Sequence, residues 1–148
     1  MEYRKPTAEE RDELLQMILD QLGGQSESAL TFLGLTPAQF ARIYRTTGEV
    51  RVVRDAATDV GYVWIEERDR TLHVHAIILR PSARGRGIGT RVFQALVAEF
   101  SPRVDELELG VQDENAASVR FYERVGFRRI PTETAPGFSV MRLPVRRP

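Results

Sequence analysis

The first third of the chain carries apolar residues at the spacing of an amphipathic helix. Thr7 opens a Thr-Ala-Glu-Glu segment, a capping box with Glu10 at the third helical position. Leucine and isoleucine then recur every three or four residues until the Gly23-Gly24 pair, which is typical of a helix end. A later start signal is Pro37, because proline is favoured in the first helical turn. The pattern predicts helices over residues 7–23, 26–33 and 36–47.

After Glu49 the pattern changes from helical to β, with valine-rich apolar runs separated by short polar segments. Such short links join antiparallel neighbours, so we expect a meander. Farther on, an apolar stripe from Ile88 to Phe100 predicts a helix, and the strands before and after it should be parallel. The predicted strands are 50–53, 60–65, 72–79, 104–111, 127–130 and 137–143, and the helices of this half are 87–101 and 114–125, the second capped by Asp113 and ended by Gly126.

These elements predict an α+β fold with a mixed, mostly antiparallel sheet flanked by helices. No repeat, low-complexity tract or linker divides the chain. We therefore expect a single domain over residues 1–148, made of a helical region (1–48), a region of strands and a glycine-rich loop (49–111) and a final region (112–148).

Composition narrows the class of protein. The 148 residues hold 21 basic and 21 acidic side chains, so no global positive field indicates a nucleic-acid partner. Cysteine is absent, which excludes disulfides and cysteine nucleophiles. No apolar run approaches the roughly 18 residues of a membrane span, and the first residues lack the apolar core of a signal peptide. We expect a cytoplasmic protein with no membrane partner, as a monomer or homodimer.

The segment Arg84-Gly85-Arg86-Gly87-Ile88-Gly89 follows a predicted strand and opens a predicted helix. Glycines let the backbone approach a ligand, and the unpaired N–H groups of a helix N-terminus attract phosphate. The segment lacks the Gly-Lys-Ser/Thr ending of a P-loop and the third glycine of a dinucleotide-binding fingerprint. The sequence therefore predicts a cradle for a phosphate or pyrophosphate of another kind.

The pattern Arg-x-x-Gly-x-Gly resembles the acyl-CoA pyrophosphate loop of the GCN5-related N-acetyltransferases (GNAT family). Leu79-Arg80-Pro81 precedes the loop much as Val-x-Pro does in that family, and the segment from Asn115 to Phe127 is similar to its second signature. The resemblance covers roughly residues 60–145.

This resemblance implies a three-layer fold in which the two central parallel strands splay apart into a V where acyl-CoA enters. It implies transfer of an acetyl group from acetyl-CoA to a primary amine by direct attack in a ternary complex, with no metal. The residues that it implies for binding acetyl-CoA are Ile78, Leu79, Arg84, Gly85, Arg86, Gly87, Ile88, Gly89, Thr90, Asn115 and Ser118. Asn115 could instead only cap its helix.

Tyr122 is a candidate general acid. Its phenol has an unperturbed pKa of ~10, so at neutral pH it carries a proton that it can donate to a departing thiolate. The family tyrosine at this place commonly does so. The alternative is a core aromatic side chain like its neighbour Phe121.

His73 and His75 are candidates for a proton relay. They lie two apart on a predicted strand and therefore on one face, and a histidine pKa near ~6.5 suits a base that accepts the amine proton. The run from His73 to Leu79 resembles the His-x-His strand of serotonin N-acetyltransferase, where two histidines form part of a water-linked proton path. On this hypothesis activity should fall as pH drops through the histidine pKa. The alternative is two polar residues on the wet side of a strand.

Other charged residues are expected to be solvated: Glu106 and Glu108 on one strand face, Glu66 and Glu67 in a turn, and Arg128, Arg129, Arg146 and Arg147 near the end. The alternative for Glu106 and Glu108 is that they attract a cationic acceptor or take a proton through water. Trp64 is expected in the core. With only two histidines and no cysteine, a zinc site has too few ligands. Two alternatives remain beside a small-amine acetyltransferase: a protein N-terminal or lysine acetyltransferase, and an acyl-CoA-binding module without transfer activity.

Overall fold

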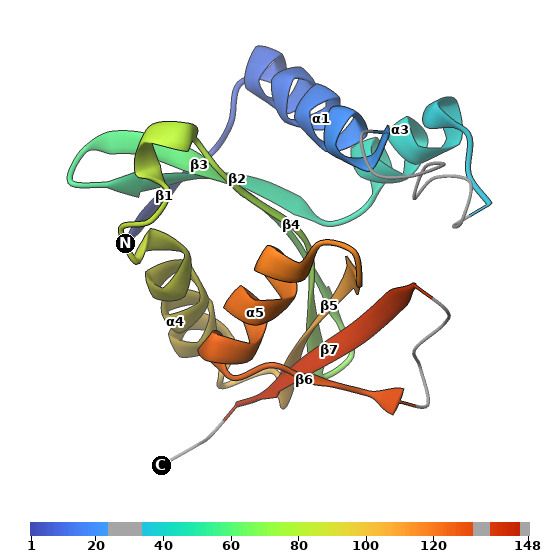
Figure 1. The fold of residues 1–148 in the computed structure, drawn as a ribbon. Helices are drawn as coiled ribbons and strands as arrows, with labels where there is room; N and C mark the ends of the chain where they lie inside the picture. Colours follow the sequence, from blue (N-terminus) through green and yellow to red (C-terminus); the bar gives the residue numbers. More distant parts are fainter. Residues whose placement is uncertain (24–33, 132–136, 146–148) are drawn as a thin grey trace.

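The computed structural model describes residues 1–23, 34–131 and 137–145. Its strands form one seven-stranded sheet in the order β1-β2-β3-β4-β5-β7-β6 (Figure 1). Only β4 and β5 pair in parallel among the strands described, so the predicted mixed, mostly antiparallel α+β fold is confirmed. The strands are β1 (Glu2–Arg4), β2 (Glu49–Asp55), β3 (Thr58–Arg68), β4 (Thr71–Leu79), β5 (Glu106–Gln112), β6 (Arg128–Arg129) and β7 (Phe138–Pro144). The helices are α1 (Ala8–Gly23), α3 (Pro37–Thr46), α4 (Ile88–Phe100) and α5 (Ala116–Val125), with a 3-10 turn at Pro81–Ala83.

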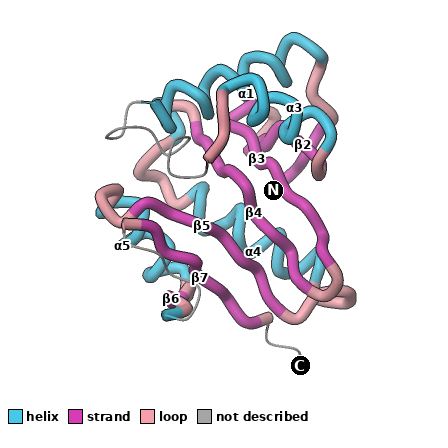
Figure 2. Tube along the Cα trace, turned by 90° about the vertical axis from the view of Figure 1, so that its right-hand side faces the viewer, coloured by secondary structure: helices cyan, strands magenta, loops and turns pink. Residues whose placement is uncertain are grey.

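Helices cover both faces of the sheet, which gives the three layers that the family resemblance implies (Figures 1 and 2). One core lies between the sheet and α4 and α5, and is built around Phe93, Leu107 and Phe127, all with no exposed surface. A second core lies between the sheet and α1 and α3, and contains Leu14 and Trp64. Trp64 is only 2% exposed, as expected.

The two N-terminal helices begin where their capping signals are. The Thr7 hydroxyl accepts from the Glu10 N–H at 3.1 Å, and the Glu10 carboxylate accepts from the Thr7 N–H at 2.9 Å. Thr36 and Gln39 form the same reciprocal pair at the start of α3. The helix predicted over 26–33 lies outside the described residues.

The parallel pairing of β4 with β5 is short. Its register covers Thr71–His73 of β4 and Glu106–Glu108 of β5, and then stops. Beyond that point β4 continues to pair with β3, and β5 continues to pair with β7. The two strands therefore separate, and the predicted V-shaped splay is confirmed; in Figure 2 both strands run across the view, with α4 behind the sheet.

A bulge in β4 lies at the start of the splay. Trp64 faces Ala76 and Ile65 faces Val74, so His75 is an extra residue opposite β3. Because side chains alternate, the extra residue reverses which positions point to each face. Val74 and Ile77 both contact the α4–α5 core, whereas Ala76 and Ile78 contact the α1–α3 core.

Three expectations were wrong in detail. The pattern gave no sign of β1, which pairs with β2 through only three residues. Helix α5 begins at Ala116 and is capped by Asn115, not by Asp113, because the Asp113 carboxylate instead accepts from the Ser139 hydroxyl at 2.6 Å. The strand predicted over 127–130 is reduced to Arg128–Arg129.

Candidate active site

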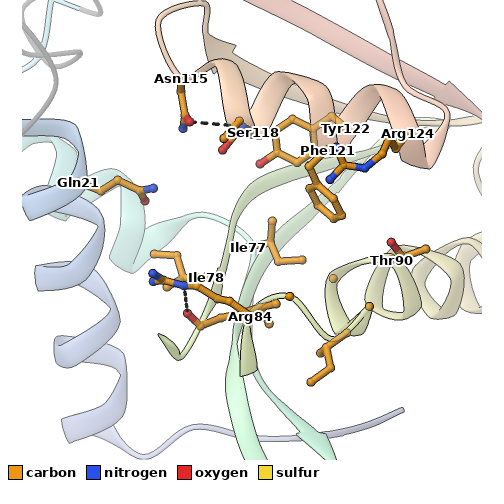
Figure 3. Close-up of a pocket in the computed structure, with 16 residues that line it drawn as sticks. Gln21, Ile77, Ile78, Arg84, Thr90, Asn115, Ser118, Phe121, Tyr122 and Arg124 are labelled. Carbon is orange, nitrogen blue, oxygen red and sulfur yellow. Dashed lines mark hydrogen bonds between the residues drawn. The ribbon is translucent and has the colours of Figure 1, made fainter. Parts of the chain in front are cut away.

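A cavity of about 770 Å³ lies between β4, the glycine-rich loop, and the helices α4 and α5 (Figure 3). All of the residues that the family resemblance implies for acetyl-CoA line this cavity except Arg86, whose guanidinium donates to the Ser82 carbonyl. The cavity therefore joins the two sequence signatures, which are 26 residues apart between Gly89 and Asn115.

The glycines of the loop have different roles. Gly85 and Gly87 have φ values of +73° and +74°, and a Cβ at either would meet nothing within 4 Å. These two positions need glycine for backbone conformation and leave open space in front of the backbone. At Gly89 a Cβ would lie 2.8 Å from the Phe121 ring, so this glycine lets α5 pack onto the first turn of α4.

The cavity is suited to an anion. Its described lining includes Arg84 and Arg124 and no carboxylate. The Arg84 Nε donates to the Leu79 carbonyl at 3.2 Å, which holds the guanidinium beside the loop. Arg124 lies over the Phe121 ring, 6.0 Å from its centroid. Together with the N–H groups at the start of α4, these cations favour a phosphate group.

The splayed edge of β4 offers backbone hydrogen bonds to a ligand. The Arg80 N–H donates to the Val60 carbonyl of β3 at 2.8 Å. Because backbone groups alternate in direction along an antiparallel pair, Ile78 also binds β3, and the backbone groups of Ile77 and Leu79 point toward the splay. Those groups lie where β5 has moved away.

Tyr122 lies on the cavity wall. Its ring contacts Phe93 and Phe127, with centroids 6.0 and 5.9 Å away. Burial raises the pKa of Tyr122 to about 12, so the phenol keeps its proton at neutral pH. Figure 3 shows the side chain reaching into the cavity from α5.

His75 forms a carboxylate–histidine pair. Its Nε2 lies 3.0 Å from Glu66 Oε1, and its ring stacks on Trp64 with centroids 4.2 Å apart. A hydrogen bond from Arg68, and then the one from His75, lowers the pKa of Glu66, so this carboxylate is ionised and only accepts. Because Glu66 can only accept, we place the proton of the neutral His75 ring on Nε2, which leaves Nδ1 as an acceptor.

His73 forms a second pair on the same face. Its Nδ1 lies 3.0 Å from Glu108 Oε1, and the other Glu108 oxygen accepts from Arg142 at 2.9 Å. The two imidazoles are in edge contact, with centroids 4.5 Å apart. The expectations that Glu66 lies in a turn and that Glu108 is a solvated strand residue were wrong, because each accepts a hydrogen bond from a histidine.

Burial acts on both histidines. It lowers the pKa of His73, and it lowers the pKa of His75 to about 4, against the opposing effect of the carboxylate partners. A histidine-dependent loss of activity at acid pH is therefore expected well below the ordinary histidine pKa that the sequence hypothesis used.

A second, smaller hollow of about 170 Å³ adjoins the first. His75 lines it, and His73 lines neither hollow. Six residues line both and form the junction: Gln21, Ile77, Ile78, Asn115, Ser118 and Tyr122. Tyr122 is thus placed where the contents of the two hollows would meet.

Sequence reasoning missed several lining residues: Gln21, Ile77, Ala117, Phe121 and Arg124. The α5 members share a helix with Asn115, Ser118 and Tyr122, so the helical period could have indicated them. Gln21 carried no such signal, because its approach depends on how α1 packs across the sheet.

No helix within residues 1–23, 34–131 and 137–145 is long and apolar enough to cross a membrane. The same ranges contain no group of three or more His, Cys, Asp or Glu side chains arranged to hold a metal ion.

Sequence comparison finds acetyltransferases. The model of the Acetyltransferase (GNAT) family matches residues 13–127. N-alpha-acetyltransferase RimI of Mycobacterium tuberculosis is 37% identical over 81 residues, which cover 52% of this chain and 50% of that protein. Aminoglycoside N(6')-acetyltransferase type 1 of Klebsiella pneumoniae is 32% identical over 76 residues, 49% of this chain and 38% of that protein. The chain therefore spans half or less of the length of these two relatives.

Structural comparison finds the same fold. The PaiA N-acetyltransferase of Thermoplasma acidophilum, solved in complex with coenzyme A, has a TM-score of 0.69 at 15% identity and covers 97% of this chain and 98% of its own. The ribosomal-protein-S18-alanine N-acetyltransferase of Escherichia coli has a TM-score of 0.65 at 16% identity, with 99% and 95% covered. The family match spans most of the chain, and the fold agrees with it over nearly all of its length: this chain belongs to the GNAT acetyltransferase family.

Proposed function

We propose that the protein is an N-acetyltransferase that moves the acetyl group of acetyl-CoA to a primary amine by direct attack in a ternary complex. The observation that carries this proposal is the junction of the two hollows. The anion-binding loop, the splayed edge of β4 and Tyr122 all line the larger hollow, and Tyr122 also lines the smaller one.

Acetyl-CoA supplies the activated acetyl group, and the residues of the larger hollow fit its charged part. Gly85 and Gly87 leave open space before the backbone, and Arg84 and Arg124 add positive charge without a carboxylate beside them in the described lining. The backbone N–H groups of Ile77 and Leu79 would hydrogen-bond the pantetheine arm and the oxyanion that forms at the thioester carbonyl.

In the transfer, the amine nitrogen forms a bond to the carbonyl carbon, and the bond from that carbon to sulfur breaks. Tyr122 faces the departing sulfur and donates its O–H to it. Because burial raises the pKa of Tyr122 to about 12, complete proton transfer to a thiolate is uphill, and we expect stabilisation chiefly through the hydrogen bond.

The amine proton would leave on the side of His75. Its Nδ1 is an acceptor, directly or through water, while Glu66 holds the ring in that tautomer. From His75 the route of the proton would continue to His73 on β4 and then to Glu108 on β5. The resemblance of this strand to serotonin N-acetyltransferase stays a prediction, as does a cytoplasmic location.

The similarity to RimI favours a second candidate acceptor, a protein N-terminus. A binding module without transfer activity is less favoured, because simple binding of acyl-CoA makes no use of a protonated phenol where the two hollows meet. Release of free CoA in the presence of amines distinguishes a transferase from a binding module.

The binding half of the proposal is tested with Gly87→Asn. Asparagine tolerates the left-handed backbone, so the fold should persist while the new side chain enters the cradle. Calorimetry should show at least about a tenfold loss of acetyl-CoA affinity, since one displaced hydrogen-bonded phosphate contact is worth roughly 1.5–3 kcal/mol. The matched control is Gly34→Asn, at φ +71° with open space and outside the cavity. Equal acetyl-CoA affinity in the two variants would show that the loop does not take part in binding acetyl-CoA.

A further inference from the structure

We propose that the acceptor is a primary amine with a single positive charge on a small apolar body, no larger than about one aromatic ring. The body would occupy the smaller hollow, here named the acceptor chamber. This inference rests on the proposed function and names its substrate class. A free amine and an apolar N-terminal residue share this chemistry, and the test below separates them.

The size of the chamber limits the body. Its volume is about 170 Å³, and an apolar cavity of roughly 150 Å³ is enough to hold benzene. Beyond the junction it is lined by the apolar Ile18 of α1, Ala76 of β4, Val111 of β5 and Phe138 of β7, together with His75, Gly110 and Gln112. Burying an apolar body against these side chains is favourable at ~25 cal/mol per Å².

Phe138 sets one wall. Its ring covers Gly110, where an added Cβ would collide with the ring. The ring therefore occupies space that a side chain at Gly110 would otherwise take, and its removal should lengthen the chamber in this direction. Phe138 is a specificity-determining residue on this account.

The charge of the chamber limits the acceptor further. Among the described residues that line it, none is Asp, Glu, Lys or Arg. The two carboxylates that pair with the histidines are already engaged: Glu66 with Arg68 and His75, and Glu108 with Arg142 and His73. A second ammonium carried into the chamber would lose its hydration without gaining a counter-ion, which is strongly unfavourable.

The same neutral lining promotes the reaction. Desolvation lowers the pKa of an amine, because it disfavours the charged form. An amine that enters the chamber with its single charge therefore loses its proton more readily and becomes a nucleophile.

A backbone carbonyl and a side-chain oxygen of β5 are placed to orient the nitrogen. The Asp113 N–H donates to the Gly137 carbonyl at 3.0 Å and the Val145 N–H donates to the Asp105 carbonyl at 2.9 Å, so the odd-numbered residues of β5 bind β7. By alternation the backbone groups of Gly110 and Gln112 face the splay. The Gln112 side-chain oxygen is also buried without a hydrogen-bond partner. The Gln112 carbonyl already accepts from the Asn115 N–H at 3.0 Å. The Gly110 carbonyl and the Gln112 side-chain oxygen are therefore the acceptors that β5 offers to the amine N–H groups in the chamber.

The test is a comparison of kcat/KM for CoA release across amines. The small apolar arms are 2-phenylethylamine, 3-methylbutylamine and a neutral peptide that begins with alanine; the contrasting arms are 2-(1-naphthyl)ethylamine, spermidine and kanamycin. We expect the kcat/KM of at least one small apolar substrate to exceed that of every contrasting amine by about tenfold or more. Comparison of the free amines with the peptide then shows whether the acceptor is a free amine or an N-terminal residue. A contrasting arm that equals or exceeds all three small apolar arms would overturn the inference and leave the proposed function intact. No release with any amine would overturn both.

Two variants test the walls directly. Phe138→Ala should raise the kcat/KM ratio of the naphthyl amine to the phenyl amine by about tenfold, with Ile43→Ala, an exposed apolar truncation on α3, as the control. Gln112→Glu, which keeps the shape and adds a negative charge, should raise the ratio of 1,4-diaminobutane to 3-methylbutylamine by a similar factor. Ratios are independent of the amount of folded enzyme. Both ratios unchanged would show that the chamber does not hold the acceptor.

Discussion

The stability of the protein should fall in mild acid because His75 is buried as a neutral group. Burial lowers the pKa of His75 from 6.5 to about 4, and its side chain is 13% exposed. A group whose pKa is depressed by folding takes up its proton first in the unfolded chain. Its contribution is therefore absent above the unfolded pKa and becomes destabilising as pH falls toward the folded pKa.

The magnitude follows from the two pKa values. At pH 8 the imidazole is neutral in both states and contributes nothing. At pH 5 the unfolded imidazole is almost fully protonated and the folded one is not, so a shift from 6.5 to about 4 lowers the free energy of unfolding by about 2 kcal/mol. Burial and Glu66 oppose each other here, because Glu66 raises the pKa of the same ring. The sign of the effect shows which of the two dominates.

The assay is urea unfolding of the wild type and His75→Gln at pH 5, 6, 7 and 8. Loss of the stacking on Trp64 should lower the variant's stability by the same amount at every pH. His73, Glu66 and Arg68 face the same ring and are present in both proteins, so the difference between the two proteins isolates His75. We expect the wild type to lose about 2 kcal/mol relative to the variant between pH 8 and pH 5. A wild type that gains stability relative to the variant over this range would mean that the Glu66 pair, not burial, controls His75.

Three further results are expected. Tyr122→Phe should keep acetyl-CoA affinity by calorimetry and lower turnover by about 10- to 150-fold, because a hydrogen bond to a charged group is worth roughly 1.5–3 kcal/mol; turnover within twofold of wild type would make Tyr122 a packing residue. Ala57→Gly should raise the free energy of unfolding by about 1 kcal/mol in urea, because Ala57 has φ +67° in the tight turn between β2 and β3; an unchanged midpoint would refute the strain. Glu66→Gln should lower the pKa of His75 further in an NMR titration, since the Glu66 hydrogen bond raises it; a rise would contradict the pairing.

The order and type of most elements could be predicted from the sequence, because they depend on contacts close in the chain. The Thr7–Glu10 capping box, the apolar stripe of α4 and the short turns of the meander are local features. The glycine-rich loop is local too, since its backbone conformation and the following helix start within a few residues of each other. The parallel pairing of β4 and β5 followed from the helix between them.

The tertiary structure decided what depends on distant residues. Glu108 is 35 positions from His73, and no period in the sequence indicates that the parallel register places them 3.0 Å apart. The bulge at His75 and the position of Gln21 arise from how β3 and α1 pack on β4. The lowered histidine pKa values follow from burial by several elements at once. Periodicity and propensity report one chain neighbourhood at a time, whereas burial, pairing and cavity shape are sums over segments that meet only in the folded protein.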